Sequence, residues 1–366
     1  MITRIRIKNF KSLADVDITL DPVTVLIGKA GSGKTNFVKA IRCLRGLVGG
    51  SGRPDGERYS FFSDDFEIRF EIDFRVNGSG NYAYAIAFHY LRNGNYAGMS
   101  ECLRQNGRDI FASKLGSWIK APNVKDLPSA GAVTISAITG ISEIAIARTY
   151  LLNGISCFDF PGDILLANGG SGEGGLIDNG ANCVGVFGAL AQNLGAIENY
   201  KQIGAALSAI SPSVTNAEIL NGNLHFGHSI GGLNFPLVPQ FESEGFRRYF
   251  AHLVAMYQSP SKQALFFEEP EKGIHPGALS SLADQFKLCA EEGRGQVILT
   301  THSPQLLDAF EPEHIRVVEM HDTKTHIGLL APEQRSAIED GLMHPRELLT
   351  VNNARTEKSP DNVVEV

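Results

Sequence analysis

The eight residues GKAGSGKT, positions 28–35, match the phosphate-loop pattern G-x-x-x-x-G-K-[ST], and this stretch decides the fold. A short β-branched run at 23–27 precedes it. Apolar residues at helical spacing follow it, namely Phe37, Val38, Ile41 and Leu44. Strand, loop and helix in this order are the context that the pattern requires, so the sequence predicts an α/β fold built around this loop.

The loop has the chemistry to bind a nucleoside triphosphate. Glycines allow backbone N–H groups to curl around a β-phosphate, and the N-terminus of the next helix adds positive potential. Lys34 can reach the β- and γ-phosphates, and the Thr35 hydroxyl can hold Mg²⁺. The alternative is a glycine-rich turn that fits the pattern by chance, but the flanking strand and helix argue against it. The predicted binding residues are Gly28, Lys29, Ala30, Gly31, Ser32, Gly33, Lys34, Thr35 and Asn36.

A second motif, ALFFEEPEKGIHP at 264–276, begins with a short apolar strand that ends in two carboxylates. Because the chain turns at the end of a strand, we expect Glu268 to face the Mg²⁺ shell and Glu269 to face the attacking water. Glu269 is then the candidate general base. The alternative is a strand end that carries two solvated acids.

A third motif, GQVILTTHSP at 295–304, holds a strand at 297–300 followed by His302. The helical spacing over 278–290 predicts that these two strands form a βαβ crossover in a parallel sheet. Their carboxyl ends then lie at the same edge as the phosphate loop, where His302 can contact the γ-phosphate. A purely structural histidine is the alternative.

Together, GKAGSGKT, FFEEPE and TTHSP resemble the ABC-type ATPase heads of the RecF, SMC and OLD-like group of AAA-family ATPases. IRIKNFKSL at 5–13 also resembles the first strand and turn of that group, and the resemblance covers 1–50 and roughly 215–320. It implies a P-loop NTPase with a mostly parallel core sheet, an antiparallel N-terminal lobe and an inserted helical or irregular subdomain. It also implies ATP and Mg²⁺ as cofactors, with Thr35 and Glu268 on the metal. The implied catalytic residues are Lys34, Glu269 as base and His302 as switch histidine.

The same resemblance implies a signature turn, for which the best match is FESEGFRRYFAHL at 241–253. Ser243 and Gly245 would form its Ser-x-Gly core, with Ser243 as the N-cap of the following helix. In the family this helix end caps the γ-phosphate bound to a second subunit, whereas an ordinary N-cap is the alternative. The sequence departs from the family pattern at two places. No Q-loop glutamine is identified, since Gln105 lies in a turn, and His275 stands where transporter members have an aspartate.

The rest of the chain sets the expected domain division. Alternating residues at 66–74 and 82–90, joined by VNGSGN, predict an antiparallel hairpin, and no heptads occur in 100–215. We expect an N-terminal ATPase lobe at 1–99, a subdomain without coiled coil at 100–215, a C-terminal ATPase lobe at 216–345 and a polar, disordered tail at 346–366. The glycine-rich stretch 168–175 is expected to be a surface linker, with a mobile lid as the alternative.

Composition bounds the cellular setting. The 366 residues carry a net charge of −7, which does not favour a protein dominated by nucleic-acid contacts. The five cysteines are widely spaced and no window approaches the ~18 apolar residues of a membrane helix, so we expect a soluble, cytoplasmic protein without membrane partners. Local DNA contact stays open at Arg4, Arg6 and Lys8 on the first strand, and at Arg247 and Arg248, although a solvated charged face is the alternative.

The favoured hypothesis is an ATP hydrolase that works as a homodimeric switch, with ATP sandwiched between two subunits. The resemblance places such cycles in DNA repair or anti-phage defence, acting on DNA or on a nuclease. We expect any nuclease or effector to be a separate protein, because the segment after His302 is too short for the Toprim nuclease domain of OLD proteins. The alternatives are a non-hydrolysing, ATP-gated scaffold and, disfavoured by the missing Q-loop, a transporter ATPase subunit.

Overall fold

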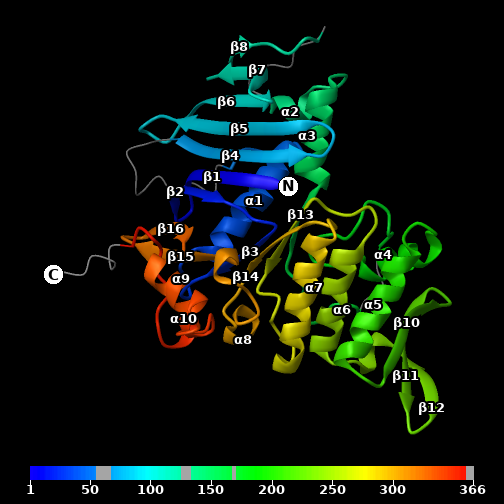
Figure 1. Ribbon diagram of the computed structural model, residues 1–366. Helices are drawn as coiled ribbons and strands as arrows, with labels where there is room; N and C mark the ends of the chain where they lie inside the picture. Colours follow the sequence, from blue (N-terminus) through cyan, green and yellow to red (C-terminus); the bar gives the residue numbers. More distant parts are fainter. Residues whose placement is uncertain (55–66, 125–132, 167–169, 360–366) are drawn as a thin grey trace. The chain divides into compact units, whose positions relative to one another are not determined.

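The computed structural model describes residues 1–54, 67–124, 133–166 and 170–359. They divide into two compact units. Unit 1 comprises Met1–Ile155, Pro312–Met343 and Asn352–Val366, and unit 2 comprises Ser156–Glu311 and His344–Val351. Figure 1 labels most of the helices and strands of both units.

Unit 1 contains a seven-stranded antiparallel sheet with the order β2-β1-β4-β5-β6-β7-β8 (Figure 1). Its strands are β1 (Ile2–Phe10), β2 (Leu13–Thr19), β4 (Glu67–Val76), β5 (Gly80–Tyr90), β6 (Tyr96–Gln105), β7 (Arg108–Lys114) and β8 (Ser117–Lys120). The predicted hairpin is confirmed as β4 and β5 over the described residues, which exclude position 66. Alternate side chains of β1 and β4 are buried, as a sheet with one apolar face requires.

Helices cover that apolar face. Phe74 of β4 stacks on Tyr150 of α3 (Ser142–Asn153) with a centroid distance of 4.3 Å. Beside α3 lie the short helix α2 (Thr134–Ala137) and the long helix α1 (Lys34–Val48), which follows the phosphate loop.

A second strand group in unit 1 positions the phosphate loop. It has the order β16-β15-β3, in which β3 (Val23–Ile27) is parallel to β15 (Ile315–His321). β15 forms a hairpin with β16 (Lys324–Leu329), and all five residues of β3 are buried. The remaining elements here are η5 (Pro312–His314) and α9 (Pro332–Glu339).

Unit 2 contains the predicted βαβ crossover. β13 (Ala264–Glu268) is parallel to β14 (Gln296–Thr300), α7 (Leu279–Glu291) connects them, and β9 (Ile155–Phe158) completes the order β14-β13-β9. Phe267 of β13 packs against Phe286 of α7 with ring centroids 4.9 Å apart, which fixes the helix on the strands. The other helices of unit 2 are α4 (Cys183–Gln192), α5 (Ile197–Ile210), η3 (Pro239–Phe241), α6 (Glu244–Tyr257), η4 (Pro276–Ala278), α8 (Pro304–Leu307) and α10 (Glu347–Thr350).

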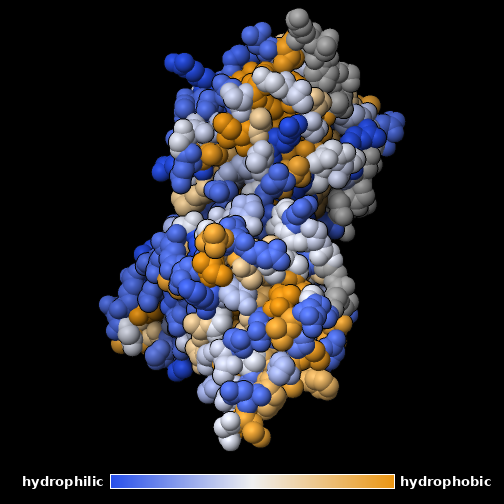
Figure 2. All heavy atoms as spheres, turned by 90° about the vertical axis from the view of Figure 1, so that its right-hand side faces the viewer, coloured by the Kyte–Doolittle hydropathy of each residue, from blue (hydrophilic) through white to orange (hydrophobic). Residues whose placement is uncertain are grey.

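Unit 2 also carries a three-stranded antiparallel sheet of β10 (Val214–Leu220), β11 (Asn223–Ile230) and β12 (Leu233–Leu237). At the turn between β11 and β12, Ile230 is 57% and Leu233 72% exposed. Figure 2 shows orange, hydrophobic spheres at the lower tip of the view, where this hairpin lies. Exposed apolar side chains thus mark this end of unit 2.

The middle of the chain forms strands and short helices in its described part. The longest helix there is α5, with 14 residues, and the glycine stretch is described only from Gly170 onward. The end of the predicted tail, 360–366, lies outside the described residues. Within the described residues, no helix is both long and apolar enough to cross a bilayer. The domain boundaries expected from the sequence stay predictions.

Candidate functional site

The phosphate loop of unit 1 connects the end of β3 to the start of α1, as predicted. Gly33 is the N-cap of α1 and has φ +109°, which favours glycine. A Cβ on Gly33 would lie 2.1 Å from Thr325 Oγ1, and a Cβ on Gly28 would lie 2.1 Å from the Val318 carbonyl oxygen. Both glycines are therefore required by the close approach of the β15–β16 hairpin.

Lys34 is buried, and its ammonium points back into the loop. Nζ donates to the carbonyl oxygens of Gly28 at 2.7 Å and Lys29 at 3.1 Å. The loop therefore already gathers a positive charge beside its own backbone, at the N-terminus of a helix. The tip residues Lys29, Ala30 and Gly31 are exposed, and Thr35 and Asn36 are half-buried in the first turn of α1.

A chain of hydrogen bonds holds this loop from two distant segments, and no sequence motif indicates it. Asn36 Nδ2 donates to Ser12 Oγ at 2.8 Å, and Ser12 Oγ lies 2.7 Å from Thr325 Oγ1. Thr325 Oγ1 in turn donates to the Ser32 carbonyl oxygen at 2.8 Å. The Asn36 amide, which was predicted to bind nucleotide, thus contacts Ser12.

Unit 2 brings together two of the predicted catalytic residues. β13 ends at the buried Glu268, and Glu269 adopts the left-handed conformation with φ +47°, uncommon for a residue with a side chain. Glu269 Oε1 lies 3.7 Å from His302 Nε2. The Glu269 backbone N–H donates to the carbonyl oxygen and to Oγ1 of Thr300, each at 3.1 Å, so the last residue of β14 fixes the turn.

Two further residues of this cluster were not predicted. Lys272 Nζ lies 3.0 Å from Glu269 Oε2. Burial lowers the pKa of Lys272, but the hydrogen bond to Glu269 and the negative charges of Glu269, Asp159 and Glu268 together outweigh it, so the pKa is raised overall. Glu271 accepts two hydrogen bonds from the loop after β14, and burial raises the pKa of its carboxyl group. Both residues lie within the EEPEKGIHP motif. Lys272 pairs with Glu269 inside that motif, whereas Glu271 contacts the loop after β14, which is distant in sequence.

The predicted signature turn lies at the N-terminus of α6. Ser243 is the N-cap, and its Oγ accepts the Phe246 N–H at 3.2 Å. A Cβ on Gly245 would lie 2.3 Å from the Gly273 carbonyl oxygen, so this glycine allows α6 to pack on the loop after β13. The Ser-x-Gly turn and the carboxylate cluster are therefore neighbours within unit 2.

Known proteins with similar sequences point to one kind of ATPase. A family model described as "AAA domain, putative AbiEii toxin, Type IV TA system" matches residues 194–308, and one described as "AAA ATPase domain" matches residues 1–76. The chain is 42% identical over 72 residues to the OLD nuclease of Thermus scotoductus, covering 20% of this chain and 14% of that protein. It is 21% identical over 363 residues to Endonuclease GajA of Bacillus cereus, covering 88% of this chain and 58% of that protein.

The fold agrees with these matches. The Smc head domain with an extended coiled coil, bound to the C-terminal domain of ScpA and derived from Pyrococcus furiosus, superimposes with a TM-score of 0.57 at 16% identity. The match covers 93% of this chain and 99% of that one. The family models, the curated relatives and the fold together support an ATPase of the ABC, SMC and OLD-like kind. The family and fold class predicted from the sequence are confirmed, while the chain spans less than two thirds of both curated relatives.

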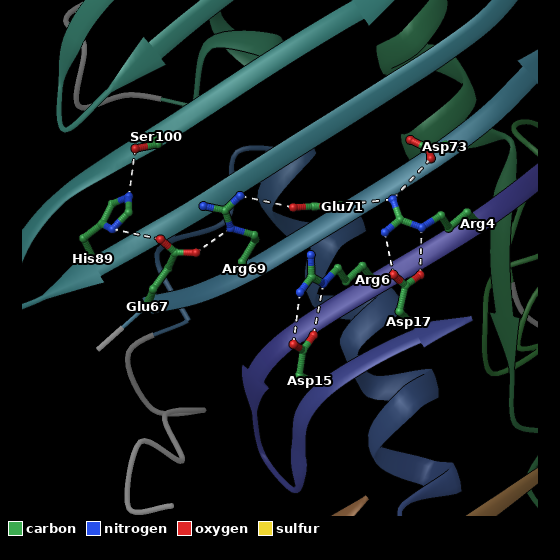
Figure 3. A network of polar contacts seen from close by, with 10 residues as sticks. All are labelled: Arg4, Arg6, Asp15, Asp17, Glu67, Arg69, Glu71, Asp73, His89 and Ser100. Carbon is green, nitrogen blue, oxygen red and sulfur yellow. Dashed lines mark hydrogen bonds and ion pairs between the residues drawn. The ribbon is translucent and has the colours of Figure 1, made fainter. Parts of the chain in front are cut away.

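The two arginines of β1 are paired with carboxylates. Arg4 binds Asp17 at 2.5 Å and Arg6 binds Asp15 at 3.0 Å, both across to β2. Figure 3 shows these pairs in a network that continues over β4 and β5. The network includes Glu67, Arg69, Glu71, Asp73 and His89. Acidic groups outnumber the arginines in it, which favours the interpretation as a solvated charged face over a DNA-binding one.

The arginines beside the predicted signature turn are also engaged. Arg247 is buried and donates to the carbonyl oxygens of Gly162, Glu242 and Ile164. Arg248 binds the Glu244 carboxylate at 3.0 Å and the Lys272 carbonyl oxygen at 3.1 Å. Both side chains therefore hold unit 2 together around α6.

Proposed function

We propose that this ATPase works as an ATP-driven homodimeric switch, in which the phosphate loop of one copy and the Ser243 turn of another enclose one ATP. The observation that carries the proposal is the cluster of Glu268, Glu269 and His302 at the carboxyl ends of two neighbouring parallel strands, where α/β proteins bind ligands. In the proposal, the cluster acts on a triphosphate held by the loop at Lys34.

The residues fit ATP and Mg²⁺. The loop has a buried ammonium at the N-terminus of α1, and this group can exchange backbone carbonyls for phosphate oxygens. Thr35 and Glu268 supply the hydroxyl and carboxylate oxygens that Mg²⁺ prefers. When bound, Mg²⁺ neutralises charge on the β- and γ-phosphates.

The chain's own residues then divide the chemical work. Lys34 binds β- and γ-phosphate oxygens, Glu269 accepts the proton of the attacking water, and His302 contacts the γ-phosphate. The backbone N–H groups at the start of α6, beside Ser243 and Gly245, contact the γ-phosphate of the second copy. Phe241, two residues before Ser243, is 75% exposed, which fits a surface that a second copy covers.

The cellular role follows the names of the curated relatives, a nuclease and an endonuclease, and is proposed on that basis alone. We propose that the switch controls a nuclease or other effector in anti-phage defence or DNA repair. DNA contact is part of the proposal only through such a partner. A cytoplasmic location is supported by the five free cysteines. The proposed domain division remains 1–99, 100–215, 216–345 and 346–366.

The test variant is Glu269→Gln. The matched control is Glu291→Gln, which changes an exposed carboxylate at the end of α7. Glu269→Gln should slow ATP hydrolysis by about 10²–10⁴-fold and accumulate a dimer when ATP is added, measured by steady-state turnover and light scattering. The control should hydrolyse ATP at the normal rate. An unchanged mass of Glu269→Gln with and without ATP would falsify the sandwich.

A further inference from the structure

Glu271 joins the two loops that carry the candidate catalytic residues of unit 2. It lies in the loop after β13, two residues beyond Glu269. Its Oε1 accepts the Thr301 hydroxyl at 2.8 Å and the His302 backbone N–H at 2.8 Å. One oxygen therefore receives two donors from the loop after β14.

These bonds fix His302 through its main chain. Thr301 is fully buried, and its hydroxyl also accepts a hydrogen bond from the Ser303 N–H at 2.9 Å. The three residues after β14 therefore form a turn that side-chain hydrogen bonds stabilise. The end of β14 also contacts the loop after β13, because Thr300 Oγ1 accepts a hydrogen bond from the Glu269 N–H. The 3.7 Å spacing between Glu269 Oε1 and His302 Nε2 is thus set by hydrogen bonds between two loops.

The second oxygen of Glu271 has a different environment. Oε2 is buried and has no hydrogen-bond partner within the described part of the chain. The two bonds at Oε1 need only an acceptor oxygen, which a carboxylate, a carboxylic acid or an amide can each supply. The position of that oxygen, and not its charge, is therefore what the geometry requires.

We propose that Glu271 is a positioning residue that sets the place of His302 relative to Glu269 during ATP hydrolysis. This inference rests on the proposed function, because it assumes that His302 and Glu269 act on bound ATP. Glu271 itself acts only through the main chain of the His302 loop.

The experiment compares three substitutions in the full chain: Glu271→Gln, Glu271→Asp and Glu271→Ala. Glutamine keeps an acceptor at the same distance from the backbone, whereas aspartate keeps the charge but withdraws the oxygen by one methylene. We expect Glu271→Gln to retain kcat for ATP hydrolysis within about threefold, and Glu271→Asp and Glu271→Ala to lose about tenfold or more with KM nearly unchanged. Glu291→Gln is again the control.

The opposite ranking would overturn the proposal, since normal turnover by Glu271→Asp with a defect in Glu271→Gln would mean that charge matters and position does not. Because Glu271→Asp changes one methylene, it keeps the test decisive if Glu271→Ala does not fold. A double-mutant cycle with His302→Ala adds a second criterion: alanine at 271 should cost little more once His302 is absent, and full additivity would contradict the proposal. If His302→Ala alone leaves turnover unchanged, it is the proposed function of His302 that fails.

Discussion

Replacing Thr325 with valine tests whether the distant hydrogen-bond chain prepares the phosphate loop for ATP. Valine keeps the β-branched shape of threonine and replaces the hydroxyl with a methyl group, which cannot form a hydrogen bond. Thr325 is 1% exposed and Ser32 is 4% exposed, so the Ser32 carbonyl oxygen loses a donor in a buried place. Leaving a buried polar group unpaired costs about 1–3 kcal/mol.

Part of this free energy should appear as weaker nucleotide binding. Without the Thr325 hydrogen bond the loop is less well ordered, and phosphate binding must then restore the conformation that the hydrogen bond maintains. Since about 1.4 kcal/mol corresponds to a tenfold change in affinity, a full transfer would raise the Kd for ATP by roughly 5- to 140-fold. The rest would appear as lower stability of unit 1. We expect a Kd increase within this range, with Thr325→Ser restoring most of the affinity because serine keeps the hydroxyl.

The assay is equilibrium titration of each variant with ATP and Mg²⁺ by calorimetry. The matched control is Thr24→Val, because Thr24 is also fully buried and its hydroxyl accepts the Asp21 N–H at 3.1 Å, at the end of β3 away from the loop. An unchanged Kd in Thr325→Val, or an equal loss in Thr24→Val, would refute the reasoning.

Two further predictions concern the loop lysine and a buried histidine. Lys34→Ala should abolish ATP binding measured by the same titration, while Lys39→Ala, an exposed lysine of α1, should not; normal turnover by Lys34→Ala would remove the loop from the mechanism. Burial lowers the pKa of His252 to about 4 from 6.5, so its neutral form stabilises unit 2 above pH 6.5, and this contribution is lost as the pH falls toward 4. Between pH 7 and pH 5 the loss should be about 2 kcal/mol of unfolding free energy, measured by denaturant titration. In His252→Phe, the difference in unfolding free energy between pH 7 and pH 5 should be smaller than in the wild type. An equal pH dependence in the variant and the wild type would contradict this role of His252.

The parts of the fold that could be predicted from the sequence are those specified by local patterns. The strand before Gly28 and the crossover from β13 to β14 each follow from a buried apolar run and a helical spacing within about 40 residues. The N-cap at Ser243 likewise depends only on neighbouring residues. The residues that determine each of these features lie close together in the sequence, so the feature can be predicted from one sequence.

The contacts that could not be predicted connect residues far apart in the sequence. Thr325 reaches Ser32 across 293 positions, and no pattern around either residue indicates the pairing. From the sequence, Arg247 is a candidate for DNA contact because it flanks the predicted signature turn, with a solvated charged face as the alternative. Arg247 is buried against three carbonyl oxygens because the segment around Gly162 packs beside α6. Hydrophobic periodicity does not predict that packing.

The ion pair between Lys272 and Glu269 decides how freely the candidate base can act. The Lys272 side chain is 48% exposed and that of Glu269 is 25% exposed, so the pair lies in solvent-screened surroundings. Such pairs contribute about 0–1 kcal/mol, and breaking one slows a reaction by less than about tenfold. A positioned general base accelerates hydrolysis by about 10²–10⁴-fold, which exceeds that cost. Lys272 can therefore orient the Glu269 carboxylate between turnovers and still release it to an attacking water.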